Sequence, residues 1–216
     1  FGYSKTVDVS VYERNKEAAD KESKYVVHCM NTGKICFFTD AGRMHQVKVL
    51  DLPYGKFRDK GTPIDNLTNY SSAEEQIIMV CDAEQMRFVK LLFATKQGML
   101  KQVDGSEFQV AKRTIAATKL QEDDELLSVQ AVTDNQCVVL QTKNGYFLKF
   151  SAADVPEKKK GAVGVRGIRL QKNDEMEHVY LYEDGIETKI QYNEKEVTLN
   201  RLKLAKRDGV GTKYRG

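Results

Sequence analysis

The chain contains no tryptophan, and its 216 residues include only three prolines and three histidines. Propeller repeats that carry a signature tryptophan are therefore excluded. The histidines, His28, His45 and His178, lie far apart and lack the spacing of metal ligands, so we expect no metal site.

The four cysteines, Cys29, Cys36, Cys81 and Cys137, include no CxxC pair, and most of them stand beside apolar residues. Cysteines of this kind are usually buried, reduced thiols. Because reduced thiols are typical of the cytosol, we expect a cytoplasmic protein.

Long apolar runs are also missing. No segment approaches the roughly 18 consecutive apolar residues of a transmembrane helix, and the N-terminus has no signal-peptide pattern, so we expect no contact with a membrane. The chain starts at Phe1 without a methionine and enters a strand almost at once. We therefore expect a piece excised from a longer polypeptide.

Catalytic motifs are absent as well, since the sequence has no GxSxG, P-loop, GxGxxG after a strand, or HExxH. The acidic run at residues 122–125 is expected to be a solvated turn, because like charges repel least in water. We expect no catalytic residue in this chain.

Residues 36–67 form the clearest structural unit in the sequence. Residues 36–39 are apolar, Asp40-Ala41-Gly42 is typical of a turn in which glycine adopts a positive φ, and residues 46–49 alternate polar and apolar. This pattern predicts a β-hairpin. A basic loop follows, and residues 61–64 then lead into another apolar segment.

The same unit recurs along the chain. Glycines at positions 2, 42, 98, 145 and 185, separated by 40, 56, 47 and 40 residues, each stand in a predicted turn before a lysine on a strand. The predicted first hairpin strands are 35–39, 91–95, 137–142 and 178–182, and further apolar segments lie at 76–80, 126–132 and 167–170. A repeat of this length is typical of blades, so we predict an all-β, propeller-like ring of about five small antiparallel sheets.

Three segments are interpreted less directly. Residues 10–20 and 71–76 each open with a Ser-x-x-Glu capping pattern and are candidates for helical turns, although a charged loop explains residues 15–24 equally well. Residues 197–204 alternate in two phases, which a β-bulge near Asn200 or Arg201 reconciles. Residues 206–216 form either a ring-closing segment or a loose tail.

Basic residues cluster after each predicted hairpin, at equivalent places in successive repeats. In a ring of blades such places lie on one rim, so we predict a curved positive band that binds the phosphate backbone of duplex DNA without reading bases. Few aromatic residues are interleaved, which disfavours single-strand stacking. The predicted DNA-binding residues are Lys56, Arg58, Lys60, Lys112, Arg113, Lys158, Lys159, Lys160, Arg166, Arg169, Arg201, Lys203, Lys206, Arg207, Lys213 and Arg215.

Net charge does not decide for or against DNA, since 34 basic residues against 31 acidic ones give only +3. The competing class is a protein-interaction propeller whose loops carry lysine and arginine for solubility. An enzyme acting alone is a third class, and it would need a cleft with perturbed titratable groups.

The repeats also carry a family resemblance. FFTDAGRMHQVKVLDLP with GTPIDNL, LLFATKQGMLKQ with KRTIAATKL, and VVLQTKNGYFLKFSAADVP with KKGAVGVRGIRL resemble successive blades of the C-terminal domain of the A subunit in bacterial DNA gyrase and topoisomerase IV, the type IIA topoisomerases. The resemblance covers nearly the whole chain. It implies one β-pinwheel domain over residues 1–216, whose blades exchange strands and whose basic rim bends duplex DNA.

The resemblance also implies partners. The domain would present DNA to the cleavage core in the rest of the A subunit, while the B subunit hydrolyses ATP; ATP and magnesium act elsewhere in the parent isomerase, and this domain holds no cofactor. The family's cleaving tyrosine follows an arginine, and none of the ten tyrosines here does. The resemblance further implies a bacterial, nucleoid-associated protein, and we expect the isolated domain to be monomeric.

One departure separates this chain from gyrase. Gyrase-type domains carry a Gln-Arg-Arg-Gly-Gly-Lys-Gly box after the first GY-x-K strand, whereas residues 15–24 here contain Glu17, Asp20 and Glu22 and no glycine. The missing box and the count of about five blades both favour a topoisomerase IV-like grip over gyrase-like wrapping.

Overall fold

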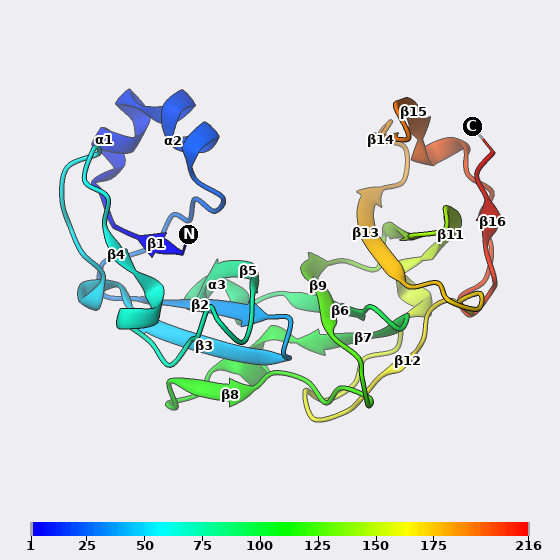
Figure 1. The fold of residues 1–216 in the computed structure, drawn as a ribbon, viewed down its shortest axis with the longest axis horizontal. Helices are drawn as coiled ribbons and strands as arrows, with labels where there is room; N and C mark the ends of the chain where they lie inside the picture. The colour runs from blue at the N-terminus through cyan, green and yellow to red at the C-terminus, as the bar shows by residue number, and fades with distance from the viewer. Residues whose placement is uncertain (1, 216) are drawn as a thin grey trace.

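Five antiparallel sheets follow one another along an open arc in the computed structural model, which describes residues 2–215 (Figure 1). Three sheets have four strands, and a two-stranded sheet lies at each end of the arc. The two end sheets are not hydrogen-bonded to each other. The predicted all-β fold of about five small sheets is confirmed, and in the described residues the ring is open.

The strands are named here sheet by sheet, from one end of the arc to the other. The first sheet pairs β1 (Tyr3–Ser4) with β4 (Thr62–Pro63). The second runs β5 (Ile77–Asp82), β2 (Lys34–Thr39), β3 (Arg43–Lys48), β8 (Thr114–Ala116). The third runs β9 (Leu126–Val132), β6 (Lys90–Thr95), β7 (Met99–Asp104), β12 (Val165–Arg166). The fourth runs β13 (Met176–Glu183), β10 (Gln136–Thr142), β11 (Tyr146–Ser151), β16 (Thr212–Lys213), and the fifth pairs β14 (Lys189–Tyr192) with β15 (Lys195–Thr198).

Each large sheet takes its outer strand from the next repeat. After the hairpin β6–β7, for example, the chain reaches back to pair β8 with β3 and then returns as β9 beside β6. The strands β12 and β16 reach back to β7 and β11 in the same way. Figure 1 shows β4, β8, β12 and β16 along the outer side of the arc. The strand exchange implied by the family resemblance is therefore present.

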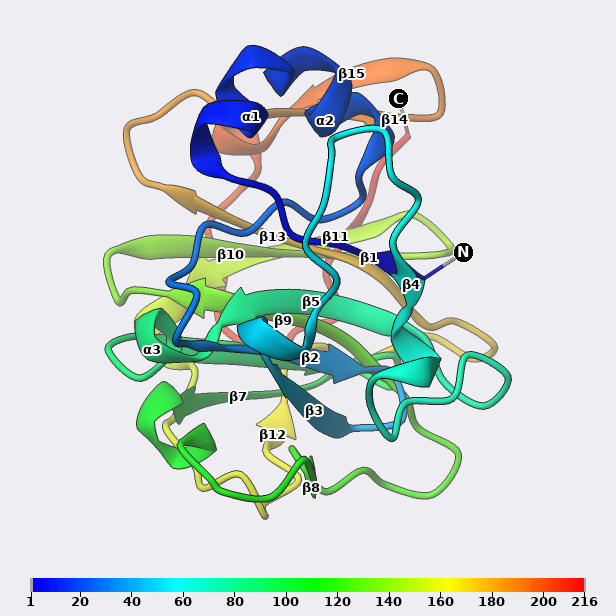
Figure 2. The same cartoon turned by 90° about the vertical axis from the view of Figure 1, so that its left-hand side faces the viewer.

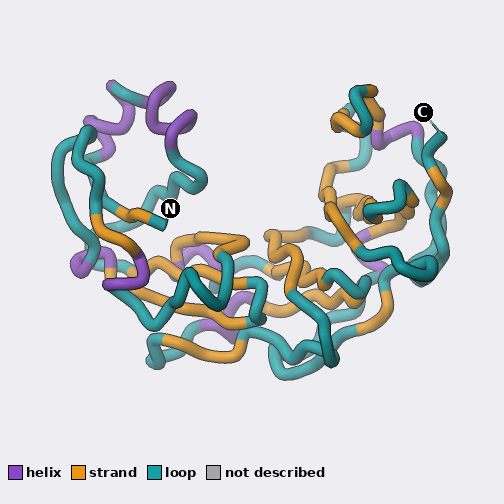
Figure 3. Tube along the Cα trace, viewed as in Figure 1, coloured by secondary structure: helices purple, strands orange, loops and turns teal. Residues whose placement is uncertain are grey.

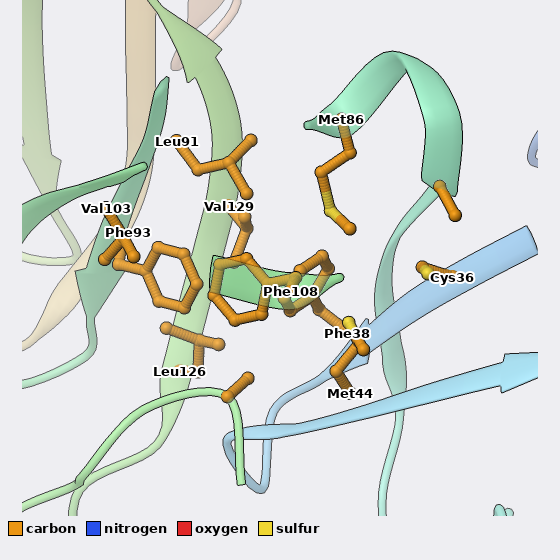
Figure 4. Close-up of a cluster of buried hydrophobic side chains, with 12 residues drawn as sticks. Cys36, Phe38, Met44, Met86, Leu91, Phe93, Val103, Phe108, Leu126 and Val129 are labelled. Atoms are coloured by element: carbon orange, nitrogen blue, oxygen red, sulfur yellow. The ribbon is translucent and has the colours of Figure 1, made fainter. Parts of the chain in front are cut away.

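The core lies between successive sheets, because a central strand sends alternate side chains to opposite faces. Phe38 and Phe93 meet edge to face between the second and third sheets, with ring centroids 5.7 Å apart, and Phe108 packs on both (Figure 4). The neighbouring residue Phe37 points the other way and joins the cluster beside the first sheet. Burial on both faces explains why these strands read as continuous apolar runs.

Helix is confined to short pieces, most of it at the N-terminal end of the arc (Figures 2 and 3). The α-helices are α1 (Val9–Arg14), α2 (Lys16–Glu22) and α3 (Ala83–Met86). The 3₁₀ turns are η1 (Val49–Asp51), η2 (Ile64–Asn66), η3 (Gly105–Phe108), η4 (Ala152–Asp154) and η5 (Leu199–Arg201). None of the helices in the described chain is long and apolar enough to cross a membrane.

Several element predictions were wrong in detail. Residues 178–182 belong to β13, which pairs with β10, and the last hairpin is β14–β15, with its turn at Asn193 and Glu194. Residues 167–170 follow the exchanged strand β12 and are not a returning strand of their own. Strand length and hydrophobicity do not reveal which partner a strand takes. Because strands are exchanged between repeats, the predictions for residues 178–182 and 167–170 were both wrong.

The capping and bulge predictions also need correction. Ser10 lies inside α1, whose N-cap is Asp8. Residues 71–76 contain the single turn for which they were a candidate, with the N–H groups of Glu74 and Glu75 donating to the Ser71 carbonyl. The change of phase after residue 197 is produced by η5, because a 3₁₀ turn follows β15 directly where we predicted a bulge. Of residues 206–216, for which we predicted a tail or a closure of the ring, residues 206–215 instead supply β16 to the fourth sheet, and residue 216 lies outside the described residues.

The predictions for cysteine hold in part. Cys36 and Cys137 are buried, Cys29 and Cys81 are half-buried, and all four are free thiols. Burial raises the pKa of both Cys36 and Cys81 to about 12. These thiols are therefore protonated and unreactive at neutral pH.

Candidate nucleic-acid interface

Four segments that lead into the exchanged strands can be aligned by their hydrogen bonds. The backbone N–H groups of Ile64, Ala117, Gly167 and Tyr214 donate to the carbonyls of the turn glycines Gly2, Gly42, Gly98 and Gly145 in that order. This alignment makes the loops 49–60, 105–113, 152–163 and 199–210 structurally equivalent. Three loops have twelve residues, and the second has nine.

Lysine occupies the same place in all three twelve-residue loops. Lys56, Lys159 and Lys206 are each the eighth residue of their loop, and all three are exposed. Because the loops lead into β4, β12 and β16, they follow the outer side of the arc (Figure 1). The equivalence inferred from the sequence thus has a geometric basis, since one charged position repeats along one edge.

Most of the remaining predicted residues are exposed too. Lys160 and Arg207 are half-buried, and the others lie on the surface. Lys60 and Lys213 lie over the rings of Tyr3 and Tyr146 respectively, at 4.3 and 5.9 Å from the ring centroids. The attraction between an ammonium group and a ring face favours this one direction for each lysine side chain.

Three predicted arginines converge where the third and fourth sheets exchange strands. Arg166 donates to both carboxylate oxygens of Asp208, at 2.5 and 3.1 Å, and Arg169 donates to the Asp208 carbonyl at 2.9 Å. Arg207 donates to the Arg166 carbonyl at 2.6 Å and to the Asp154 carbonyl at 3.0 Å. These hydrogen bonds join β12 to the segment that leads into β16.

The ion pair also shifts the titration of its members. The Arg166 guanidinium lowers the pKa of the Asp208 carboxyl, and Asp208 in turn raises the pKa of Arg166. Because both groups are exposed, this pair adds little to stability on its own.

A lysine that the sequence did not single out holds the third basic loop from inside. Lys101 on β7 is only 1% exposed, and its Nζ donates to the carbonyls of Lys159, Lys160 and Ala162 at 3.2, 2.9 and 2.6 Å. Burial lowers the pKa of Lys101 to about 8, against an opposing effect of Glu107. The only trace in the sequence was the repeated glycine-then-lysine pattern, which we interpreted as a strand.

Lys5 makes the equivalent contacts next to the first sheet. It stands three residues after Gly2, as Lys101 stands three after Gly98, and its Nζ donates to the carbonyls of Phe57 and Asp59. The loop it holds carries Lys56, Arg58 and Lys60. Two of the three twelve-residue loops are thus bound by a lysine at the same position.

In the second sheet, the residue three places after the turn glycine is His45 instead of a lysine. Its Nε2 lies 2.5 Å from Oε1 of Glu75, and its Nδ1 lies 2.8 Å from the hydroxyl of Thr114 on the exchanged strand. Thr39 donates to the other oxygen of Glu75 at 2.9 Å, and Arg43 lies 3.4 Å from it. His45 and Glu75 are both almost fully buried. Sequence reasoning missed this network, because its members are far apart in the chain and form no motif.

The segment in which a gyrase-type box was sought is helical. Residues 15–24 contain α2, and the Tyr12 hydroxyl donates to Asp20 at 2.9 Å. Of the two readings left open for this stretch, a helical turn and a charged loop, the helix is correct. The described residues contain no group of three or more His, Cys, Asp and Glu side chains placed to hold a metal ion.

Comparison with known protein families decides what these repeats are. The family model described as "DNA gyrase C-terminal domain, beta-propeller" matches residues 90–133 and 138–182, which cover the third sheet and most of the fourth. The chain is a β-pinwheel of the DNA gyrase and topoisomerase IV C-terminal type. The resemblance proposed from the sequence is confirmed.

Individual relatives agree with the family model. The DNA gyrase A subunit of Lawsonia intracellularis is 34% identical over 186 residues, covering 80% of this chain and 22% of that protein. The DNA gyrase A subunit of Metamycoplasma arthritidis is 27% identical over 195 residues, covering 85% of this chain and again 22% of the relative. The chain therefore spans about a fifth of the length of the curated relatives it matches.

Solved structures share the fold at low sequence identity. The C-terminal domain of DNA topoisomerase IV superposes with a TM-score of 0.85 at 22% identity, covering 98% of this chain and 69% of that one. The C-terminal domain of DNA gyrase A gives 0.65 at 18% identity, covering 86% and 61%. Both likenesses concern the β-pinwheel architecture.

Proposed function

We propose that this β-pinwheel binds duplex DNA along its outer edge without sequence specificity and bends it. The observation that carries the proposal is the recurrence of an exposed lysine at one place in three equivalent loops, Lys56, Lys159 and Lys206. Loops spaced along an arc favour contact with a curved phosphate backbone, and each phosphate neutralised releases counterions.

We further propose a place for the domain in a larger enzyme. The gyrase A relatives support a role as the C-terminal part of the DNA-cleaving chain of a type IIA topoisomerase, a bacterial cytoplasmic enzyme whose B subunit hydrolyses ATP. In such an enzyme the domain presents DNA to the cleavage core for strand passage. The chemistry belongs to the parent isomerase, and we assign no catalytic residue to this part.

A topoisomerase IV-like grip is the better proposal than gyrase-like wrapping. Residues 15–24 fold as α2 and carry acidic side chains, with no basic, glycine-rich box. The arc is also open in the described residues, so its two ends do not form a continuous path. Both features favour a short bend over a full wrap.

The first experiment combines duplex binding at several salt concentrations with ligation of nicked circular plasmid in the presence of the chain. We expect affinity that falls steeply with salt and an unchanged linking number after ligation. A positive shift in linking number that grows with protein concentration would instead support gyrase-like wrapping. Absence of binding at low salt would favour the protein-interaction alternative, which predicts a partner that survives nuclease treatment in a pull-down.

A further inference from the structure

Lys101 is a buried lysine that faces no carboxylate in its hydrogen bonds. Its Nζ lies among three backbone carbonyls, those of Lys159, Lys160 and Ala162. An ammonium group has three N–H donors and no acceptor, so three carbonyls match its capacity in full. The side chain also runs over the ring of Phe93, with Nζ 5.4 Å from the centroid, which fixes its direction.

The loop held in this way contains the longest run of consecutive lysines in the chain. Residues 158–160 are three consecutive lysines, and like charges so close together repel and favour a loose loop. The backbone is nevertheless fixed at its start, because the N–H of Lys158 donates to the Gln102 carbonyl at 2.8 Å. Glu107 accepts from the N–H of Lys160 at 3.2 Å, so both sides of the loop are held.

The three carbonyls all turn inward to one point, and this leaves the lysine side chains on the outside. Lys158 and Lys159 are exposed, and Lys160 is half-buried. At the next residues the loop returns to β12 through Gly164, whose φ of 99° lets the backbone pass the Leu100 carbonyl. The inward carbonyls and the outward charges are therefore two sides of one backbone conformation.

We infer that Lys101 is a positioning residue for DNA binding: by capping three carbonyls of the loop 152–163, it fixes the conformation in which Lys158, Lys159 and Lys160 face a phosphate backbone. Lys5 does the same for the loop 49–60 through the carbonyls of Phe57 and Asp59. This inference rests on the proposed function. Neither lysine contacts DNA in it, since each acts through the loop it holds.

The test uses Lys101→Met in the full chain, which keeps the length of the side chain and removes its donors. Lys149→Met is the matched control for cleavage, because Lys149 is also a buried lysine but donates to the carbonyls of Leu199 and Asn200, at the start of the loop 199–210. The first readout is tryptic cleavage after residues 158–160, which does not involve DNA. The second is duplex affinity as a function of salt.

We expect K101M to speed cleavage in the loop about tenfold or more and to lower the salt slope of duplex binding by roughly 0.9 for each phosphate that the loop no longer neutralises. K149M is expected to leave cleavage after residues 158–160 unchanged. A lower melting temperature alone would not change the salt slope of the folded protein, so a merely structural role is distinguishable. Unchanged cleavage and an unchanged slope in folded K101M would overturn the inference.

Two further measurements keep the test decisive. If K101M does not fold, the side-chain ¹⁵Nζ signal of Lys101 in the wild type serves instead: a slowly exchanging ammonium at neutral pH supports the carbonyl contacts, and rapid exchange overturns them. The variant K158Q/K159Q/K160Q separates the role of Lys101 from the role of the loop in DNA binding. Loss of affinity there with none in K101M overturns only the role of Lys101, whereas no loss in either variant also removes this loop from the proposed function.

Discussion

The second and third sheets attach their exchanged strands by two different junctions, although both use the residue three places after the turn glycine. In the third sheet Lys101 caps the carbonyls of a twelve-residue loop, and Gly164 then enters β12 with a positive φ. In the second sheet His45 meets Thr114, which stands at the place of Gly164 and does not have a positive φ. There the loop is three residues shorter and the strand one residue longer.

The residue three places after the turn glycine can therefore hold either a basic loop or the exchanged strand itself. Around Lys101 the longer loop bends over the ammonium and returns to the strand through Gly164. The shorter His45 side chain binds the exchanged strand β8 directly, through the hydroxyl of Thr114. The first junction presents a basic loop, and the second fixes the strand through a buried polar network.

The largest expected effect comes from breaking the histidine junction. Glu75→Ala leaves His45 and Thr39 buried without their partner, and we expect a loss of about 3 kcal/mol in the free energy of unfolding, measured by urea denaturation. Arg43→Gln is the control: its side chain is 49% exposed, so its loss should cost less than about 1 kcal/mol. A Glu75 variant as stable as this control would contradict the network.

The lysine junction depends on its glycine. In Gly164→Ala the new Cβ would lie 2.5 Å from the Leu100 carbonyl oxygen, at a φ of 99°. We expect a loss of about 2 kcal/mol, because backbone cannot give way as a side chain can. Gly161→Ala is the matched control, since a Cβ there meets nothing within 4 Å. Equal stability of the two variants would show that the junction does not need this backbone conformation.

A smaller loss is expected from Thr114→Val, which keeps the shape of the side chain and removes its hydroxyl. The hydroxyl lies 2.8 Å from Nδ1 of His45 and accepts from Asn69 at 3.2 Å. Loss of these bonds should cost about 1 kcal/mol in urea denaturation. If stability is unchanged while Glu75→Ala remains destabilising, the network fixes β3 but not the exchanged strand.

The smallest effect concerns pH. Burial lowers the pKa of Lys101 to about 8, below that of the unfolded chain, so above pH 8 the unfolded state binds more protons. Stability from this group therefore rises with pH, by on the order of 0.5 kcal/mol between pH 8 and 8.5. The difference in unfolding free energy between wild type and K101M, measured at both pH values, isolates this group from the other lysines. A difference that stays constant would mean that Lys101 titrates as an exposed lysine.

The sequence predicted the repeat and its hairpins well because these features are local. The turn glycines Gly42, Gly98 and Gly145 have a positive φ as predicted for Gly42, and residues 126–132 form β9 with the predicted bounds. The last hairpin was misplaced because Asp184 and Gly185 look like a hairpin turn, while pairing is decided by partners far away in the chain.

Only the exposed basic residues of the candidate site could be predicted from the sequence. Clusters of lysine and arginine are visible in any sequence, and most of those residues are exposed as expected. The residues that hold the loops, Lys101 and Lys5, looked like ordinary strand positions. His45 could not be joined to Glu75 and Thr114 without the fold, because exchange between repeats brings together residues about 30 and 69 positions apart.

The most direct test of the central claim, that equivalent outer loops bind the phosphate backbone, is the salt dependence of duplex affinity in the variant K56Q/K159Q/K206Q. The charge-matched control is K16Q/K21Q/K24Q, which removes three exposed lysines in and just after α2. The account predicts that the loop variant lowers the slope by roughly 0.9 for each of the three contacts, and that the control keeps most of the wild-type slope. Equal slopes in both variants would contradict it, because binding would then follow total charge and not the outer loops.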